Sequence, residues 1–206
     1  MKYVRSRKVL PGLFLMLFVL TAAGTAAYLI SQSFRRNALT VGENTIRIEE
    51  SFEPPEEQEP GWNPYEKQVR IRNTGPVPCF VRVFLAFSEL EAENCSELLG
   101  ADGEWVSFSE YPLHLPEGWI WVEESEEEVL GGYYYYEEAL ACEEETEALT
   151  EAIRSYYEEG EEPPAYEVLV YAESVQSRDS SGQEFGGEAA WRSAWREFLA
   201  GKGGEG

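Results

Sequence analysis

Apolar and polar positions alternate in several short segments of this chain, which is the pattern of half-buried β-strands. Clusters of Gly, Pro and Asn separate these segments and act as turn signals, as in Asn73-Thr74-Gly75-Pro76. Seven or eight such strands predict an all-β fold, an antiparallel β-sandwich. The predicted strands lie at residues 41–48, 67–72, 77–88, 104–108, 119–122, 133–136 and 166–175.

The segment from Val77 to Ser88 gives the strongest strand signal. One face carries Cys79 and every second residue to Phe87, and the other carries Phe80, Arg82 and Phe84. Because both faces are largely apolar, this strand is expected in the centre of the sandwich. Residues 166–175 form the second long strand, whereas the Glu-rich run 49–61 is expected to be solvated. In the segment 133–136, two tyrosines are expected in the core and two on the surface.

One helix is predicted in the same part of the chain, at residues 188–200. Its apolar residues recur at helical spacing and form a single stripe, which is expected to pack on the sandwich. The stripe consists of Trp191, Ala194, Trp195, Phe198 and Leu199.

The N-terminus has the layout of a secretory signal peptide. Basic residues precede an apolar run, Val9 to Leu20, and a string of small residues that ends at Ala27. Cleavage is expected after Ala27, so that the mature chain begins at Tyr28. The alternative is a retained membrane anchor, because Val9 to Ile30 is long enough to span a bilayer.

The charge of the chain excludes several classes of partner. Removing residues 1–27 takes away four positive charges and changes the formal net charge from −23 to −27. Such a surface repels nucleic acid and anionic lipid. Any contact with a membrane is therefore expected only through the N-terminal segment before cleavage. Residues 201–206 are expected to form a disordered tail.

Several segments together resemble the TasA/camelysin family, whose signal peptides are processed by the dedicated peptidase SipW. The pieces occur in the family's order and cover most of the chain. The matching stretches are Gly24 to Tyr28, Phe34 to Ile48, Val69 to Val83 with its Asn-Thr-Gly turn, Gly132 to Tyr136 followed by Leu140, and Val170 to Gln176 followed by Ala194-Trp195.

The resemblance implies a jelly-roll sandwich over residues 41–200 and a protein secreted to the cell surface of a Gram-positive type of bacterium. It also implies assembly into biofilm-matrix fibres, with the chain itself as partner and a matrix polysaccharide as a further one. In that family the mature N-terminus of one subunit completes the sheet of the next. Residues 28–40 are the corresponding segment here, and an alternating set within them is the candidate donor strand. That set is Tyr28, Ile30, Gln32 and Phe34.

The remaining chemistry does not indicate an enzyme or a cofactor. The camelysin branch has been classed with metalloproteases, but this chain has one histidine, His114, where a zincin needs two on one helix. His114 with Asp102 or Asp179 lacks the nucleophile elbow of a hydrolase. Glu-rich runs at 123–128 and 143–147 read as solvated loops rather than calcium sites.

Three cysteines leave the disulfide state open between one bridge with a free thiol, an intermolecular bridge and none. They are Cys79, Cys95 and Cys142, and together with His114 they lack the paired spacing of a zinc site.

Two functions fit these observations best. The first is a secreted structural subunit that polymerises by exchange of the N-terminal strand after signal cleavage. The alternative is a monomeric surface module that recognises a polysaccharide or a host protein. A metalloprotease ranks below both.

Overall fold

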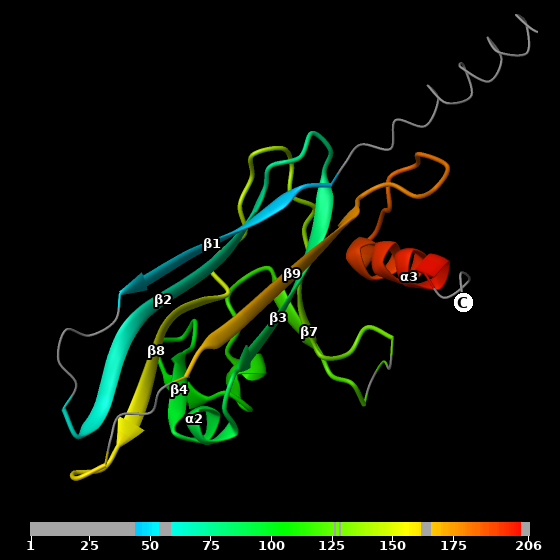
Figure 1. Ribbon diagram of the computed structural model, residues 1–206. Coiled ribbons are helices and arrows are strands. Elements are labelled where there is room, and N and C mark those ends of the chain that lie inside the picture. The colour runs from blue at the N-terminus through cyan, green and yellow to red at the C-terminus, as the bar shows by residue number, and fades with distance from the viewer. Residues whose placement is uncertain (1–43, 54–58, 126, 128, 162–165, 203–206) are drawn as a thin grey trace, which may run out of the picture. The chain divides into compact units, whose positions relative to one another are not determined.

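The computed structural model describes residues 44–53, 59–125, 127, 129–161 and 166–202. In this part of the chain nine strands form two antiparallel sheets that pack face to face (Figure 1). Sheet A has the strand order β1-β2-β8-β4-β5, and sheet B has the order β6-β7-β3-β9. The prediction of an all-β sandwich with a short C-terminal helix is thereby confirmed.

The bounds of the elements follow in chain order. They are β1 (Ile46–Glu53), β2 (Gly61–Asn73), β3 (Cys79–Phe87), α2 (Leu90–Asn94), β4 (Ser96–Leu99), β5 (Trp105–Ser107), the 3₁₀-helix η1 (Tyr111–Leu113), β6 (Trp119–Val122), β7 (Tyr133–Tyr136), β8 (Thr150–Tyr157), β9 (Val168–Gln176) and α3 (Ala190–Lys202).

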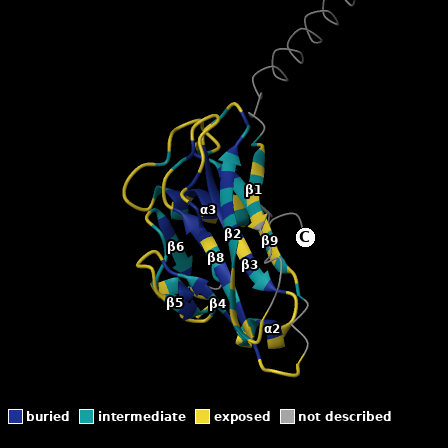
Figure 2. Ribbon diagram, turned by 90° about the vertical axis from the view of Figure 1, so that its left-hand side faces the viewer, coloured by how far each residue is buried: buried dark blue, intermediate teal, exposed yellow. Residues whose placement is uncertain are grey.

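The core lies between the two sheets, and β3 is its central strand in sheet B. Val81, Val83 and Leu85 point into the core and are buried, as the alternation predicts. Val69 and Ile71 of β2 meet them from sheet A. In Figure 2 the buried residues follow the strands in the middle of the domain, while the exposed ones gather in the connecting loops.

A second apolar layer covers part of the outer face of sheet B. The helix α3 packs Trp191 and Trp195 against Tyr135 of β7, with ring centroids 4.8 Å and 5.9 Å apart. Phe80 of β3 and Val175 of β9 belong to the same cluster. The helix begins two residues later than predicted, at Ala190. Four residues of its apolar stripe pack on the sheet as expected, whereas Phe198 is 37% exposed.

This helix overturns the expectation for the four tyrosines of β7. Tyr134 and Tyr136 do face the core between the sheets. Tyr135, however, is fully buried under α3, and Tyr133 is half-buried beside it. The outer face of β7 is therefore buried as well, because the amphipathic helix α3 covers it.

The Glu-rich run after Ile48 is only partly the solvated segment that was expected. The strand β1 continues through Glu53 and pairs with β2 over its whole length. Its acidic residues meet basic residues of β2: Glu49 lies opposite Arg70, and Glu50 bonds to the buried Lys67. Opposite charges on neighbouring strands stabilise a pairing that the composition alone disfavours.

Buried tyrosines make the fold sensitive to alkaline pH. Burial raises the pKa of Tyr134 and of Tyr111 above the ordinary value for tyrosine. Their protonated forms therefore stabilise the folded state fully below the pKa of unfolded tyrosine, which is about 10. Above that pH the unfolded chain releases protons that the folded chain retains, so stability falls as pH rises.

We predict that the free energy of unfolding decreases between pH 9 and pH 11, by up to about 1.4 kcal/mol per pH unit for each such tyrosine. Urea unfolding monitored by tryptophan fluorescence measures the slope. Tyr134→Phe should reduce it. An identical slope in this variant would show that Tyr134 is not protonated selectively in the folded state.

Candidate functional site

The residues proposed from the sequence for cleavage and assembly lie outside the described part of the chain. They are Ala27, Tyr28, Ile30, Gln32 and Phe34. The structure therefore brings none of them together. It does show the domain on which an N-terminal strand would act, beginning with the point at which the chain enters that domain.

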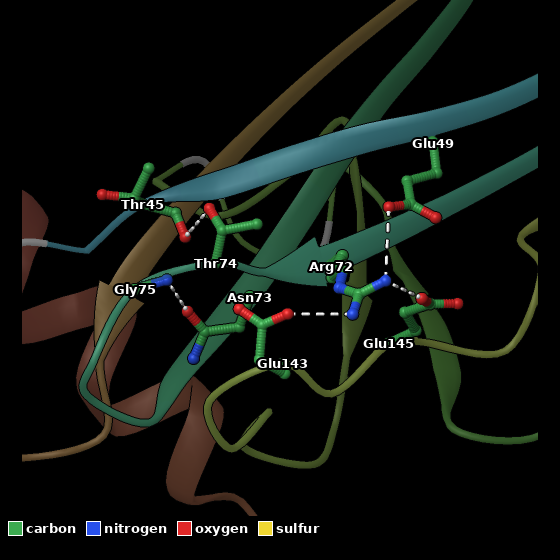
Figure 3. A network of polar contacts seen from close by, with 8 residues as sticks. All are labelled: Thr45, Glu49, Arg72, Asn73, Thr74, Gly75, Glu143 and Glu145. Atoms are coloured by element: carbon green, nitrogen blue, oxygen red, sulfur yellow. Dashed lines mark hydrogen bonds and ion pairs between the residues drawn. The ribbon is translucent and has the colours of Figure 1, made fainter.

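A buried turn fixes the start of β1 (Figure 3). The Asn73 side chain is fully buried, and its amide donates to the carbonyl oxygens of Val77 and Leu140 at 2.8 Å and 2.9 Å. Its oxygen accepts from the backbone N–H of Gly75 at 2.9 Å. Thr74 donates from its backbone N–H to the carbonyl of Thr45 at 2.9 Å. The Asn-Thr-Gly turn thus holds the first described residues of the domain, because Thr74 bonds to the carbonyl of Thr45 through both its backbone N–H and its hydroxyl.

An ion-pair network lies beside this turn (Figure 3). Arg72 of β2 bonds to Glu143 and Glu145, each at 2.9 Å, and lies 3.8 Å from Glu49 of β1. The hydrogen bond to Glu143 raises the pKa of the Arg72 guanidinium. The acidic loop after Cys142 is therefore attached to β2 by salt bridges.

The two sheets differ in the chemistry of their edges. On one side of the sandwich the edge strands are β1 and β9, each hydrogen-bonded to a single described neighbour. β1 carries four charged residues in eight, a composition that discourages further strand pairing. β9 carries one in nine, Glu173, and its first five residues, Val168 to Ala172, are uncharged and contain no proline. Of the two edges on this side of the sandwich, β9 is therefore the one that better suits an added strand.

The single charge of β9 is directed onto the outer face of sheet B, where it meets Arg82 of β3. Both Nε and a terminal nitrogen of Arg82 donate to one oxygen of Glu173, the Nε bond being 2.8 Å long. The guanidinium lies between the rings of Tyr133 and Trp195, 3.9 Å and 4.3 Å from their centroids. It also donates to the hydroxyl of Tyr135 at 3.2 Å.

Burial alone would lower the pKa of Arg82, but its hydrogen bonds to Tyr135 and Glu173 outweigh burial and raise it. Arg82 is therefore a charged group in an apolar layer, and it joins three strands to α3.

Next to this cluster the outer face of sheet B is uncovered. Phe84 of β3 lies opposite Tyr171 of β9 and is 6.0 Å from Tyr133 between ring centroids. Leu169 is the next outward residue along β9. The exposed fraction is 41% for Phe84, 46% for Leu169 and 55% for Tyr171. We name these three residues the β9 patch; it adjoins the uncharged edge.

Of the other candidate residues from the sequence, the structure brings His114 and Asp102 together. His114 and Asp102 lie 2.7 Å apart in an exposed pair. Within the described residues, no three His, Cys, Asp or Glu side chains come close enough together to hold a metal ion. All three cysteines are free thiols, and burial raises the pKa of Cys79 to about 12. The described part of the chain also has no helix that is long and apolar enough to cross a membrane.

Comparisons with protein-family models, with curated proteins and with solved structures gave no match for this chain. The resemblance to the TasA/camelysin family therefore remains an expectation from the sequence. The β9 patch and the edge beside it were not identified from the sequence, although one signal was present: the near absence of charge between residues 167 and 178.

We predict that Arg82→Met lowers the free energy of unfolding by about 3–5 kcal/mol, because it leaves Glu173 largely buried without its partner. Replacing both residues, as Arg82→Met with Glu173→Met, should restore most of that loss. Chemical denaturation measures both.

Arg72→Met is the matched control. The Arg72 side chain is 33% exposed, compared with 6% for Arg82, so its ion pairs are screened by solvent. We expect it to lower the free energy of unfolding much less than Arg82→Met does. Equal losses in the Arg82 and Arg72 variants would contradict the role given to burial.

Proposed function

We propose that this chain is a secreted structural subunit that assembles into extracellular fibres of the biofilm-matrix type. After cleavage behind Ala27, the segment from Tyr28 to Asn37 of one subunit adds as a strand to the β9 edge of the next. The observation that carries the proposal is the chemistry of that edge, which is long, uncharged over Val168 to Ala172 and flanked by the β9 patch.

Incomplete burial along β9 supports the same assignment. Val168, Val170 and Ala172 pack against the core between the sheets, yet each is only half-buried. On the other face Leu169 and Tyr171 are exposed. A strand added beside β9 covers apolar surface on both faces, and its main chain can pair with the edge over Val168 to Ala172.

Charge also favours this occupant. The segment from Tyr28 to Asn37 contains Arg35 and Arg36 and no acidic residue, whereas the whole chain has a net charge of −23. A positive strand is attracted to an acidic domain, while two acidic domains repel each other. Contacts between subunits therefore depend on the N-terminal segment.

This contact is head-to-tail, because the donor segment and the acceptor edge are different surfaces of one chain. Such an interface does not close on itself and generates filaments. In the precursor, the donor segment is continuous with the apolar run that ends at Leu20. Signal cleavage then becomes the step that releases the strand for assembly.

We predict that deleting Tyr28 to Asn37 from the mature protein gives a folded monomer that forms no fibres, because the donor strand is absent. Electron microscopy and size-exclusion chromatography measure the outcome. Tyr171→Lys should slow assembly of the otherwise intact mature chain, because it adds a positive charge to the edge that is proposed to accept a positively charged segment.

Leu113→Lys is the control for that substitution, since Leu113 is an exposed apolar residue in η1, away from β9. It should assemble at the original rate. Fibres formed by the truncated protein as readily as by the mature chain would rule out strand donation. A mature chain that stays monomeric under all conditions would favour the alternative, a surface binding module.

A further inference from the structure

A row of aromatic side chains crosses the outer face of sheet A, on the opposite side of the sandwich from the β9 patch. Trp62 of β2 and Tyr156 of β8 are cross-strand partners, with ring centroids 5.4 Å apart. The guanidinium of Arg154 follows, 4.4 Å from the ring centroid of Trp62 and 4.8 Å from that of Trp105 in β5. We call these four residues the sheet A strip.

The strip is held rigid by an ion pair. Arg154 lies opposite Glu97 of β4, and its Nε donates to a carboxylate oxygen of Glu97 at 2.7 Å. The pair neutralises the one positive charge in the row and fixes the guanidinium between the two indole rings. The strip is therefore a preformed surface, in which aromatic faces rather than net charge are presented to solvent.

Two aromatic side chains of the strip leave a large part of their surface exposed to solvent. Trp62 is 43% exposed and Tyr156 is 40% exposed. Two neighbouring aromatic rings exposed on the face of a sheet, beside a salt bridge, indicate a surface that binds a partner. Exposed aromatic rows suit an extended chain whose units offer C–H faces for stacking, which is the chemistry of a polysaccharide.

The negative charge of the protein favours some classes of polysaccharide over others. The chain has a net charge of −23, and the one cation of the strip, Arg154, is paired with Glu97. Its surface therefore repels polymers of uronate or phosphate. A polymer with ammonium groups is attracted to that surface, and ammonium groups also bind favourably over aromatic rings. We propose that the sheet A strip binds an amino-sugar polysaccharide, laid across β2, β8 and β5. This inference concerns a different sheet and does not rest on the proposed assembly.

Binding of three soluble probes to the full chain tests the proposal: β-linked oligomers of glucosamine, of N-acetylglucosamine and of galacturonate. Isothermal titration calorimetry should show binding of the glucosamine oligomer, weaker binding of the neutral oligomer and none of the anionic one. Trp62→Ala and Tyr156→Ala should each weaken binding of the glucosamine oligomer by about fivefold to tenfold, the equivalent of one aromatic contact.

Leu113→Ala is the control for Tyr156→Ala, because Leu113 is also an exposed large apolar residue but lies in η1, outside the sheet A strip. It should bind the glucosamine oligomer as the unmodified chain does. Equal affinities of the Tyr156 and Leu113 variants would show simple ion exchange with an acidic surface and overturn the proposal. Binding of the neutral oligomer as tightly as the amino form would overturn the role given to ammonium groups.

Discussion

The buried cation–carboxylate contact between Arg82 and Glu173 organises sheet B and its covering helix. Arg82 lies on the central strand β3, Glu173 on the edge strand β9, and the rings that enclose the guanidinium come from β7 and α3. A buried pair of this kind contributes little net stability compared with apolar residues, but breaking it is costly. The main effect of the pair is therefore on geometry: it fixes the positions of β9 and α3 against the rest of sheet B.

The same contact determines which surface of the domain is left free. Because Glu173 is directed towards Arg82, the only charged side chain of β9 is paired on the outer face of the sheet. β1, the neighbouring edge of the sandwich, is protected by its many charges. In the proposed fibre this asymmetry selects β9 rather than β1 as the acceptor edge on this side of the sandwich.

Much of the fold was predictable from period-two alternation. The faces of β3, the strands at 119–122 and 133–136 and the stripe of α3 are confirmed. β8 and β4 were missed because polar residues face the core in both: Ser155 and Ser96 bond to each other at 2.8 Å there. In such a pair each buried hydroxyl has a hydrogen-bond partner, so polar residues can occupy core positions. The alternation of apolar and polar residues that identifies a strand in the sequence is then lost.

The candidate site was less predictable for a different reason. The donor segment follows from a local pattern, Tyr28 to Phe34, whereas an acceptor edge exists only once strands have been ordered into sheets. The sequence shows that residues 168–172 lack charge, but not that β9 is an edge. The sheet A strip likewise depends on register, since Trp62, Arg154 and Trp105 are far apart along the chain.

Hydrogen–deuterium exchange of β9 amides, compared between monomer and fibre, tests the central claim most directly. A free edge strand exposes half of its backbone N–H groups, and a donated strand pairs them. The account predicts slower exchange in peptides covering Val168–Gln176 when fibres form, with no change in β6, the other edge of sheet B. Unchanged exchange in β9, or protection of β6 instead, would contradict it.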